Sequence, residues 1–162
     1  MGRRFGPDTF WYESRLETHP VPGRGLGLFP KESPFHMFYD GEYVCEYEGE
    51  SIIMQEGKER HARLKAAGNS KCYIFEEEHR NKKICIDATV DDGRMDRLIN
   101  HSRHWPNLYV KHEKIHGLVC VLFFALKDIR PGEEFTYDYG DRSLQSLERN
   151  CNRVMMMFPF LK

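Results

Sequence analysis

The stretch DIRPGEEFTYDYGD, residues 128–141, decides how the chain is expected to fold. Its proline–glycine pair favours a tight turn, and the aromatic and β-branched residues that follow favour a strand. Because successive side chains of a strand point to opposite faces, we expect Tyr137 and Tyr139 on one face and Asp138 on the other. The pattern therefore predicts two phenol hydroxyls that face the same volume of space.

Most of the chain before this stretch has the pattern of short strands. Alternation in YVCEYE places Tyr43, Cys45 and Tyr47 on one face. Further strands are predicted for LGLF (26–29), CYIF (72–75), ICID (84–87), NLYVKHE (107–113) and LVCVLFFAL (118–126). CYIF and ICID are expected to form a hairpin around the charged loop EEEHRNKK, whose carboxylates either cover a solvated surface or attract a basic substrate.

One helix and one N-terminal arm complete the predicted organisation. Residues 54–67 contain good helix formers, and Gly68 is a suitable C-terminal stop. Residues 1–20 mix charged, aromatic and proline residues without a period, so we expect an extended or poorly ordered arm. Many short strands with one helix predict a β-rich α+β domain built from several small sheets.

Composition limits the classes of partner. The 162 residues suffice for one domain, and 24 basic against 25 acidic residues give a net charge of -1. This balance argues against broad electrostatic attraction to nucleic acid or to anionic membranes. The longest apolar run, residues 118–126, is less than half as long as a membrane-spanning helix. Five cysteines without a CxxC pair indicate a reducing compartment. We expect a soluble, intracellular monomer without a metal, a membrane contact or sequence-specific nucleic-acid binding.

Two motifs invite readings that their context does not favour. GRGLG (23–27) is similar to a dinucleotide-binding loop, but such a site needs a helix directly afterwards. Pro30 and Pro34 block a helix here. The sequence therefore favours a structural turn or a close approach of the backbone to a ligand. HEKIH (112–116) fits the HExxH pattern of zinc hydrolases, which also requires a helix. Gly117 and strand-like flanks favour a hairpin connection with solvated histidines instead.

The NHS tripeptide at 100–102 follows an apolar Leu-Ile pair, so its polar side chains begin where an element leaves the core. Asn100 and His101 each carry donor and acceptor atoms, which either satisfy the local backbone or bind a ligand. No single motif of the chain names a function.

Taken together and in order, the motifs resemble those of the SET-domain protein-lysine methyltransferases. The matching pieces are GRGLGLF (23–29), EYEGE (46–50), CYIF, CIDAT (85–89), RLINHS (97–102), PN (106–107) and the closing stretch 128–141. The resemblance covers roughly residues 22–143. CIDAT, RLINHS and YDYGDRS (137–143) are most similar to the branch that monomethylates a lysine in the tail of histone H4.

The resemblance implies a fold and a division of the chain. It implies several short β-sheets, a knot-like crossing of the late segment past the NHS strand, and a helix at 54–67 as one wall of the substrate groove. Residues 1–20 would be the arm, residues 21–143 the SET domain, and residues 144–162 a segment that closes the cofactor site. S-adenosylmethionine and the peptide would bind on opposite faces, joined by a narrow channel.

The resemblance also implies roles for individual residues. The expected cofactor-binding residues are Arg24, Gly25, Leu26, Tyr73, Asn100, His101 and Phe160. The expected channel tyrosines are Tyr47, Tyr137 and Tyr139, of which Tyr139 orients the lysine amine and Tyr137 limits the product to one methyl group. Asp141 is expected to contact the peptide.

The resulting hypothesis is a nuclear, chromatin-associated methyltransferase that monomethylates a lysine of a histone tail, with histone H4 or the nucleosome as substrate. A methyltransferase of a non-histone protein is one alternative. A SET-like module that binds a peptide without catalysis is another, and the zinc hydrolase suggested by HEKIH is a third.

Overall fold

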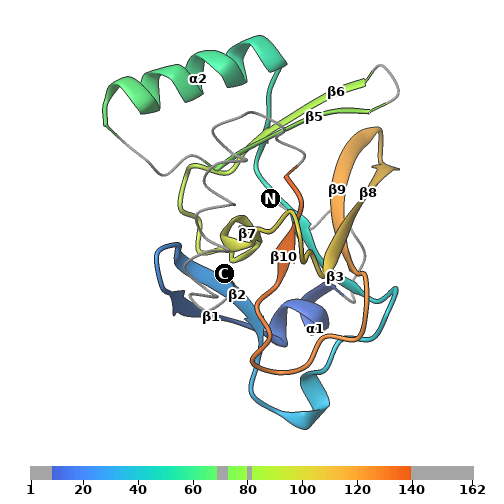
Figure 1. Ribbon diagram of the computed structural model, residues 1–162. Helices are drawn as coiled ribbons and strands as arrows, with labels where there is room; N and C mark the ends of the chain where they lie inside the picture. The colour runs from blue at the N-terminus through green and yellow to red at the C-terminus, as the bar shows by residue number, and fades with distance from the viewer. Residues whose placement is uncertain (1–8, 69–72, 80–81, 140–162) are drawn as a thin grey trace.

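The computed structural model describes residues 9–68, 73–79 and 82–139, and this part of the chain forms four small sheets and two α-helices (Figure 1). The predicted β-rich α+β architecture is confirmed. Helix α1 (Thr9–Ser14) lies near the start of the described chain, and α2 (Met54–Ala66) lies between β4 and β5. No helix of the described residues is long and apolar enough to cross a membrane.

Two of the sheets have three strands each. One contains, in spatial order, β3 (Tyr43–Tyr47), β9 (Leu118–Ala125) and β8 (Leu108–Ile115). The other contains β4 (Glu50–Ser51), β6 (Lys82–Asp87) and β5 (Ile74–His79). The neighbouring strands within both sheets are antiparallel.

The other two sheets have two strands each. Strand β1 (Leu16–Val21) pairs antiparallel with β2 (Gly25–Pro30), and β7 (Asn100–His101) pairs parallel with β10 (Thr136–Tyr137). Short 3-10 helices occupy Pro34–His36 and Asp96–Leu98. In Figure 1 the β7–β10 pair lies in the middle of the view, between the β1–β2 hairpin and the β3–β9–β8 sheet. The NHS segment and the closing stretch, 36 residues apart in register (Asn100 with Thr136), are thus brought side by side.

The core is centred on strand β9. Cys120 to Phe123 are buried on both faces of this central strand, which explains their unbroken apolar run. Phe38 and Phe135 pack against one another edge to face beneath it, with ring centroids 5.3 Å apart. The core therefore joins the closing stretch to the three-stranded sheet.

The HEKIH motif lies on a strand and its turn, as the hairpin interpretation predicts. His112 belongs to β8, whereas His116 and Gly117 form the two-residue turn into β9, with φ of 49° and 84°. Positive φ at both central residues is typical of the type I′ turn, whose twist matches that of the flanking strands. The helical geometry that a HExxH zinc site needs is absent from this hairpin.

Helix α2 has the predicted start and stop. Gly68 adopts φ 72° directly after the helix, and its N–H donates to the Lys65 carbonyl, as a C-terminal glycine cap does. Gly57 is the only residue of α2 that is buried. Its missing side chain lets the helix approach Cys85 of β6, over which α2 packs (Figure 1).

Residues 9–20, which were expected to belong to an extended or poorly ordered arm, instead form α1 and most of β1. Their order comes from long-range contacts that leave no periodic signal. Arg15 is 3% exposed, bonds the Glu42 carboxylate at 2.6 Å, and lies 3.9 Å from the ring centroid of Phe38. Tyr12 packs edge to face on Tyr43 at 5.2 Å.

Two further expectations about strands are corrected. Residues 76–79, expected in a loop, continue β5, an edge strand on which charged residues are tolerated. In β3, a register shift between Tyr43 and Cys45 marks a bulge. The extra residue turns Tyr43 toward Cys120 and Leu122, away from the main core that holds Cys45, so the predicted single face is divided.

Candidate active site

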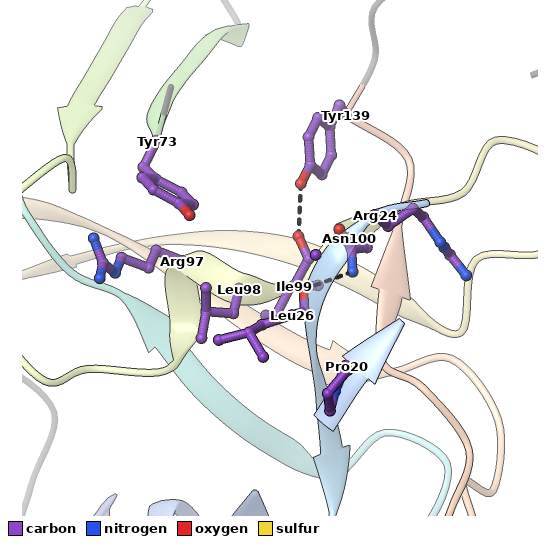
Figure 2. Close-up of a pocket in the computed structure, with 10 residues that line it drawn as sticks. Pro20, Arg24, Leu26, Tyr73, Arg97, Leu98, Ile99, Asn100 and Tyr139 are labelled. Carbon is purple, nitrogen blue, oxygen red and sulfur yellow. Dashed lines mark hydrogen bonds between the residues drawn. The ribbon is translucent and has the colours of Figure 1, made fainter. Parts of the chain in front are cut away.

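A pocket of about 480 Å³ opens between the β1–β2 turn, the start of β5 and strand β7 (Figure 2). Six residues predicted from the sequence line it: Arg24, Gly25, Leu26, Tyr73, Asn100 and Tyr139. They come from four separate segments of the chain. The structure thus brings together most of the predicted cofactor residues and one channel tyrosine.

The glycine-rich turn forms one side of the pocket. Gly25 has a φ of 80°, a backbone conformation that residues with a side chain rarely adopt. The neighbouring Leu26 is 47% exposed. The Arg24 side chain extends away from Tyr73 (Figure 2) and pairs with the Glu134 carboxylate at 2.6 Å. The guanidinium is therefore engaged by the protein itself.

Asn100 lines the pocket next to the glycine-rich turn. Its Nδ2 donates to the Leu26 carbonyl at 3.0 Å, drawn in Figure 2, and to Oε1 of Glu134 at 2.7 Å. These bonds join β7 to the glycine-rich turn. Glu134 was missed in the sequence analysis, although the GEE of the closing stretch contains it.

His101 does not line the pocket but supports its wall. Its Nδ1 accepts the backbone N–H of Tyr139 at 3.0 Å, and the two rings lie 5.0 Å apart. An atom that accepts this N–H carries no proton, so the 4.0 Å approach of Asp138 to Nδ1 is not a hydrogen bond. His101 thereby fixes the backbone where the closing stretch leaves β10.

Tyr137 and Tyr139 meet as the alternation predicts, although β10 ends at Tyr137. Their ring centroids are 4.5 Å apart. Tyr137 is buried, whereas Tyr139 is 47% exposed over the whole residue. The Tyr139 hydroxyl nevertheless points inward and donates to the Ile99 carbonyl at 2.6 Å (Figure 2). Burial of this hydroxyl raises the pKa of Tyr139 well above its ordinary value, and the electrostatic effect of Tyr73 adds a smaller rise.

The third predicted tyrosine joins the same cluster through two phenylalanines. Tyr47 donates its hydroxyl to the Tyr73 carbonyl at 2.8 Å. Phe75 lies 5.4 Å from Tyr47 and stacks on Tyr137 at 6.3 Å, and Phe123 lies 4.8 Å from Tyr137. The sequence analysis did not select Phe75 or Phe123, yet Phe75 is two residues from Tyr73, the spacing that places strand residues on one face. These aromatic residues form an apolar surface beside the pocket.

Arg97 is a further pocket residue that was missed. Its guanidinium lies 4.7 Å from the ring centroid of Tyr73 and pairs with the Asp91 carboxylate at 2.6 Å. The Tyr73 ring and the Arg97 guanidinium thus form a cation–π contact in the wall of the pocket. RLINHS begins with this arginine, which was the available signal.

Two predicted site residues, Asp141 and Phe160, lie outside the described residues, as does the predicted closing segment 144–162. Among the described residues, no group of three or more His, Cys, Asp or Glu side chains is placed to hold a metal ion.

Comparison with known proteins places these features in one family. A model described as SET domain matches residues 25–140. The chain is 42% identical over 132 residues to histone-lysine N-methyltransferase Set8 of Drosophila melanogaster, covering 82% of this chain and 18% of that protein. It is 38% identical over 136 residues to N-lysine methyltransferase KMT5A of Xenopus tropicalis, covering 84% of this chain and 39% of that protein.

Solved structures agree with the sequence comparisons. CpSET8 from Cryptosporidium superposes with a TM-score of 0.68 at 30% identity, over 79% of this chain and 58% of that one. The structure of ctPRC2 in an autoinhibited conformation bound to S-adenosylmethionine gives a TM-score of 0.63 at 32% identity, over 85% of this chain and 16% of that one. This chain therefore spans well under half the length of Set8 and KMT5A. The SET-domain match includes the tyrosine cluster and the pocket residues from Gly25 onward.

Proposed function

Because this chain belongs to the SET-domain family, we propose that it is an S-adenosylmethionine-dependent protein-lysine N-methyltransferase. One observation carries the proposal: Tyr139 belongs both to the pocket wall and to the tyrosine cluster. A methyl donor in the pocket and an amine beside the tyrosines would meet at this residue. Enzymes gain rate by holding two reactants in this way.

The pocket residues fit the cofactor. Its volume of about 480 Å³ lies within the range of small-molecule sites. We assign Arg24, Gly25 and Leu26 to backbone contacts, Asn100 to the amino-acid portion, and Tyr73 to the pocket wall, with His101 supporting from behind. When bound, S-adenosylmethionine supplies an electrophilic methyl group on a sulfonium.

The aromatic cluster suits a lysine that must lose its proton. A free lysine has a pKa of about 10.4, and its ammonium has no lone pair for attack. Dry aromatic surroundings disfavour the charged form, and so does a nearby cation. Tyr47, Phe75 and Phe123 are all buried and supply such surroundings. The site then needs no strong general base.

Tyr139 is suited to orient the neutral amine. Its hydroxyl hydrogen is engaged by the Ile99 carbonyl, so the oxygen presents its acceptor lone pairs to an amine N–H. His101 and Ile99 together hold the residue at its backbone and at its hydroxyl. With the cofactor bound, Tyr139 would hold the amine in position to receive the methyl group, a placement that lowers the barrier.

Tyr137 is assigned to product control. Its ring is packed by Phe75 and Phe123 and is 7% exposed, so it cannot move aside for a larger substituted amine. We infer that the hydroxyl, together with a water that it would bind, takes the room that a second methyl group needs. The proposed product is monomethyl-lysine.

A histone tail is the proposed substrate, with histone H4 favoured by the resemblance of CIDAT, RLINHS and YDYGDRS. The names of the relatives Set8 and KMT5A support a lysine of a histone or another protein. A chromatin substrate places the proposed activity in the nucleus. Asp141 remains the predicted peptide contact.

Transfer of a labelled methyl group tests the proposal and its substrate. The chain is incubated with labelled S-adenosylmethionine and, in separate reactions, with core histones, nucleosomes and a mixed protein extract, and the modified residue is located by mass spectrometry. We expect one methyl group on a lysine of histone H4. Label only on a non-histone protein would contradict the substrate, and binding of the cofactor without transfer to any protein would favour a peptide-binding module.

A further inference from the structure

The Glu134 carboxylate lies behind the pocket, between Arg24 and Asn100. Oε2 accepts from the Arg24 guanidinium at 2.6 Å, and Oε1 accepts from Asn100 Nδ2 at 2.7 Å. The Glu134 side chain is 13% exposed. Both oxygens are thus used, in different directions, by two residues that line the pocket.

These contacts determine which way the Asn100 amide points. A carboxylate and a backbone carbonyl only accept hydrogen bonds, so the amide atom that faces Glu134 and Leu26 must be the nitrogen. Both Nδ2 hydrogens are then engaged. Among the described residues no hydrogen bond is made to Oδ1, which leaves an acceptor on a residue that lines the pocket.

Close packing holds the carboxylate in this place. A Cβ on Gly27 would lie 2.7 Å from Oε1 of Glu134, 2.7 Å from Cγ2 of Val21 and 3.2 Å from Asn100 Nδ2. A side-chain carbon cannot approach these atoms to within 3.0 Å, so an added Cβ would have to displace the carboxylate or Val21. The absence of a side chain at Gly27 of GRGLG thus leaves room for the observed position of the Glu134 carboxylate.

We propose that Glu134 is a positioning residue: together with the Leu26 carbonyl, it fixes the Asn100 amide so that Oδ1 is presented to a positively charged amino group of the pocket's ligand. This inference rests on the proposed function, which supplies the ligand, since S-adenosylmethionine carries an α-ammonium group. An ammonium only donates hydrogen bonds and is matched by an oxygen. A reversed Asn100 amide would oppose it with a donor. Glu134 acts through Asn100.

Calorimetry with two ligands tests the role of Glu134 without measuring turnover. The ligands are S-adenosylmethionine and an analogue that lacks the α-amino group. The Kd of the analogue divided by the Kd of S-adenosylmethionine, called the Kd ratio, reports recognition of the ammonium. In Glu134→Gln the new side chain can also donate, so of the two groups that set the amide orientation only the Leu26 carbonyl remains an obligate acceptor. Because the Leu26 carbonyl still favours the same orientation, we expect Glu134→Gln to bind S-adenosylmethionine about threefold to tenfold more weakly, the range for one neutral hydrogen bond, with little change for the analogue.

The adjacent glutamate provides a matched control. Glu133 is 38% exposed and pairs with Lys127 at 3.3 Å, away from the pocket. Glu133→Gln is expected to keep the wild-type Kd ratio. Gly27→Ala, whose new Cβ displaces Oε1 without changing any charge, is expected to lower the ratio, and it keeps the test decisive if Glu134→Gln does not fold.

The outcomes separate the inference from the proposed function. The positioning role would be overturned if Glu134→Gln and Gly27→Ala both kept the wild-type Kd ratio of the two ligands. It would also be overturned if the variants bound both ligands more weakly by the same factor, which a merely structural role predicts. A wild-type protein that binds the cofactor without discriminating against the analogue would also overturn it. A wild-type protein that does not bind S-adenosylmethionine would remove the proposed function itself and the inference with it.

Discussion

Replacing Asn107 with alanine should destabilise the protein strongly, because this buried side chain fastens the closing stretch. Asn107 is 5% exposed; its Nδ2 donates to the Glu134 carbonyl and its Oδ1 accepts the Thr136 N–H, both at 2.8 Å. The change leaves the buried Thr136 N–H unsatisfied, which costs about 1–3 kcal/mol, and removes a second hydrogen bond worth about 1 kcal/mol. We expect a loss of about 3 kcal/mol in the free energy of unfolding.

Thermal and urea unfolding, each without cofactor, measure this loss. For a domain of this size about 3 kcal/mol corresponds to a fall in Tm of roughly 6–12 °C. The urea midpoint should fall with an unchanged m value. Ser102→Ala is the control in the same loop, since its hydroxyl accepts the Trp105 N–H in an exposed setting where water replaces it, and its effect should stay within about 0.5 kcal/mol. The reasoning is refuted if Asn107→Ala melts no lower than Ser102→Ala.

Three further changes have defined outcomes. Burial raises the pKa of Asp96 to about 7. Between about pH 4 and 7 this carboxyl ionises in the unfolded chain but keeps its proton in the folded one, so the free energy of unfolding should fall by up to about 4 kcal/mol as the pH rises through that window. Asp96→Asn should flatten this dependence of the unfolding free energy on pH. An unchanged slope would show that Asp96 ionises normally. Gly57→Ala places a methyl group against Cys85 Sγ and should lower the urea midpoint, because overpacking costs about 1–3 kcal/mol against a helix-propensity gain of about 1 kcal/mol; a more stable variant would mean that α2 is free to shift. Tyr137→Phe should allow dimethyl-lysine to form, and a mass spectrum that still shows one methyl group would count against the product assignment.

The strands and the tyrosine pair were predictable because they depend on short-range patterns. Alternation alone placed Tyr137 and Tyr139 together, and their rings lie 4.5 Å apart. The turn of HEKIH was predictable in the same way, since Gly117 favours a positive φ. These features need only a few neighbouring residues.

Features set by distant contacts could not be predicted from such patterns. The order of residues 9–21 depends on Arg15, whose partners Glu42 and Phe38 lie more than 20 residues away. The bulge in β3 changes the face of Tyr43 without a glycine or proline to mark it. Glu134 was overlooked for the same reason, since its role comes from Arg24 and Asn100, 110 and 34 residues away in sequence.

Asn100 and His101 have different roles in the structure, a difference that the sequence analysis did not predict. The resemblance named Asn100 and His101 together, whereas in the structure Asn100 lines the pocket and His101 holds the Tyr139 backbone from behind. Adjacent strand residues point to opposite sides, so this division follows from β7 being a strand. Alternation within NHS was the signal that would have separated them.

The most direct test of the proposed catalysis measures cofactor affinity and single-turnover methyl transfer together, in the wild-type protein and in Tyr139→Phe. The variant keeps the ring beside Tyr137 and His101 but loses the hydroxyl that donates to Ile99 and that we propose orients the amine. We expect nearly unchanged binding of S-adenosylmethionine and transfer to histone H4 slowed by about a hundredfold or more, as expected for lost alignment of the reacting groups. Transfer by Tyr139→Phe at the wild-type rate would contradict the account.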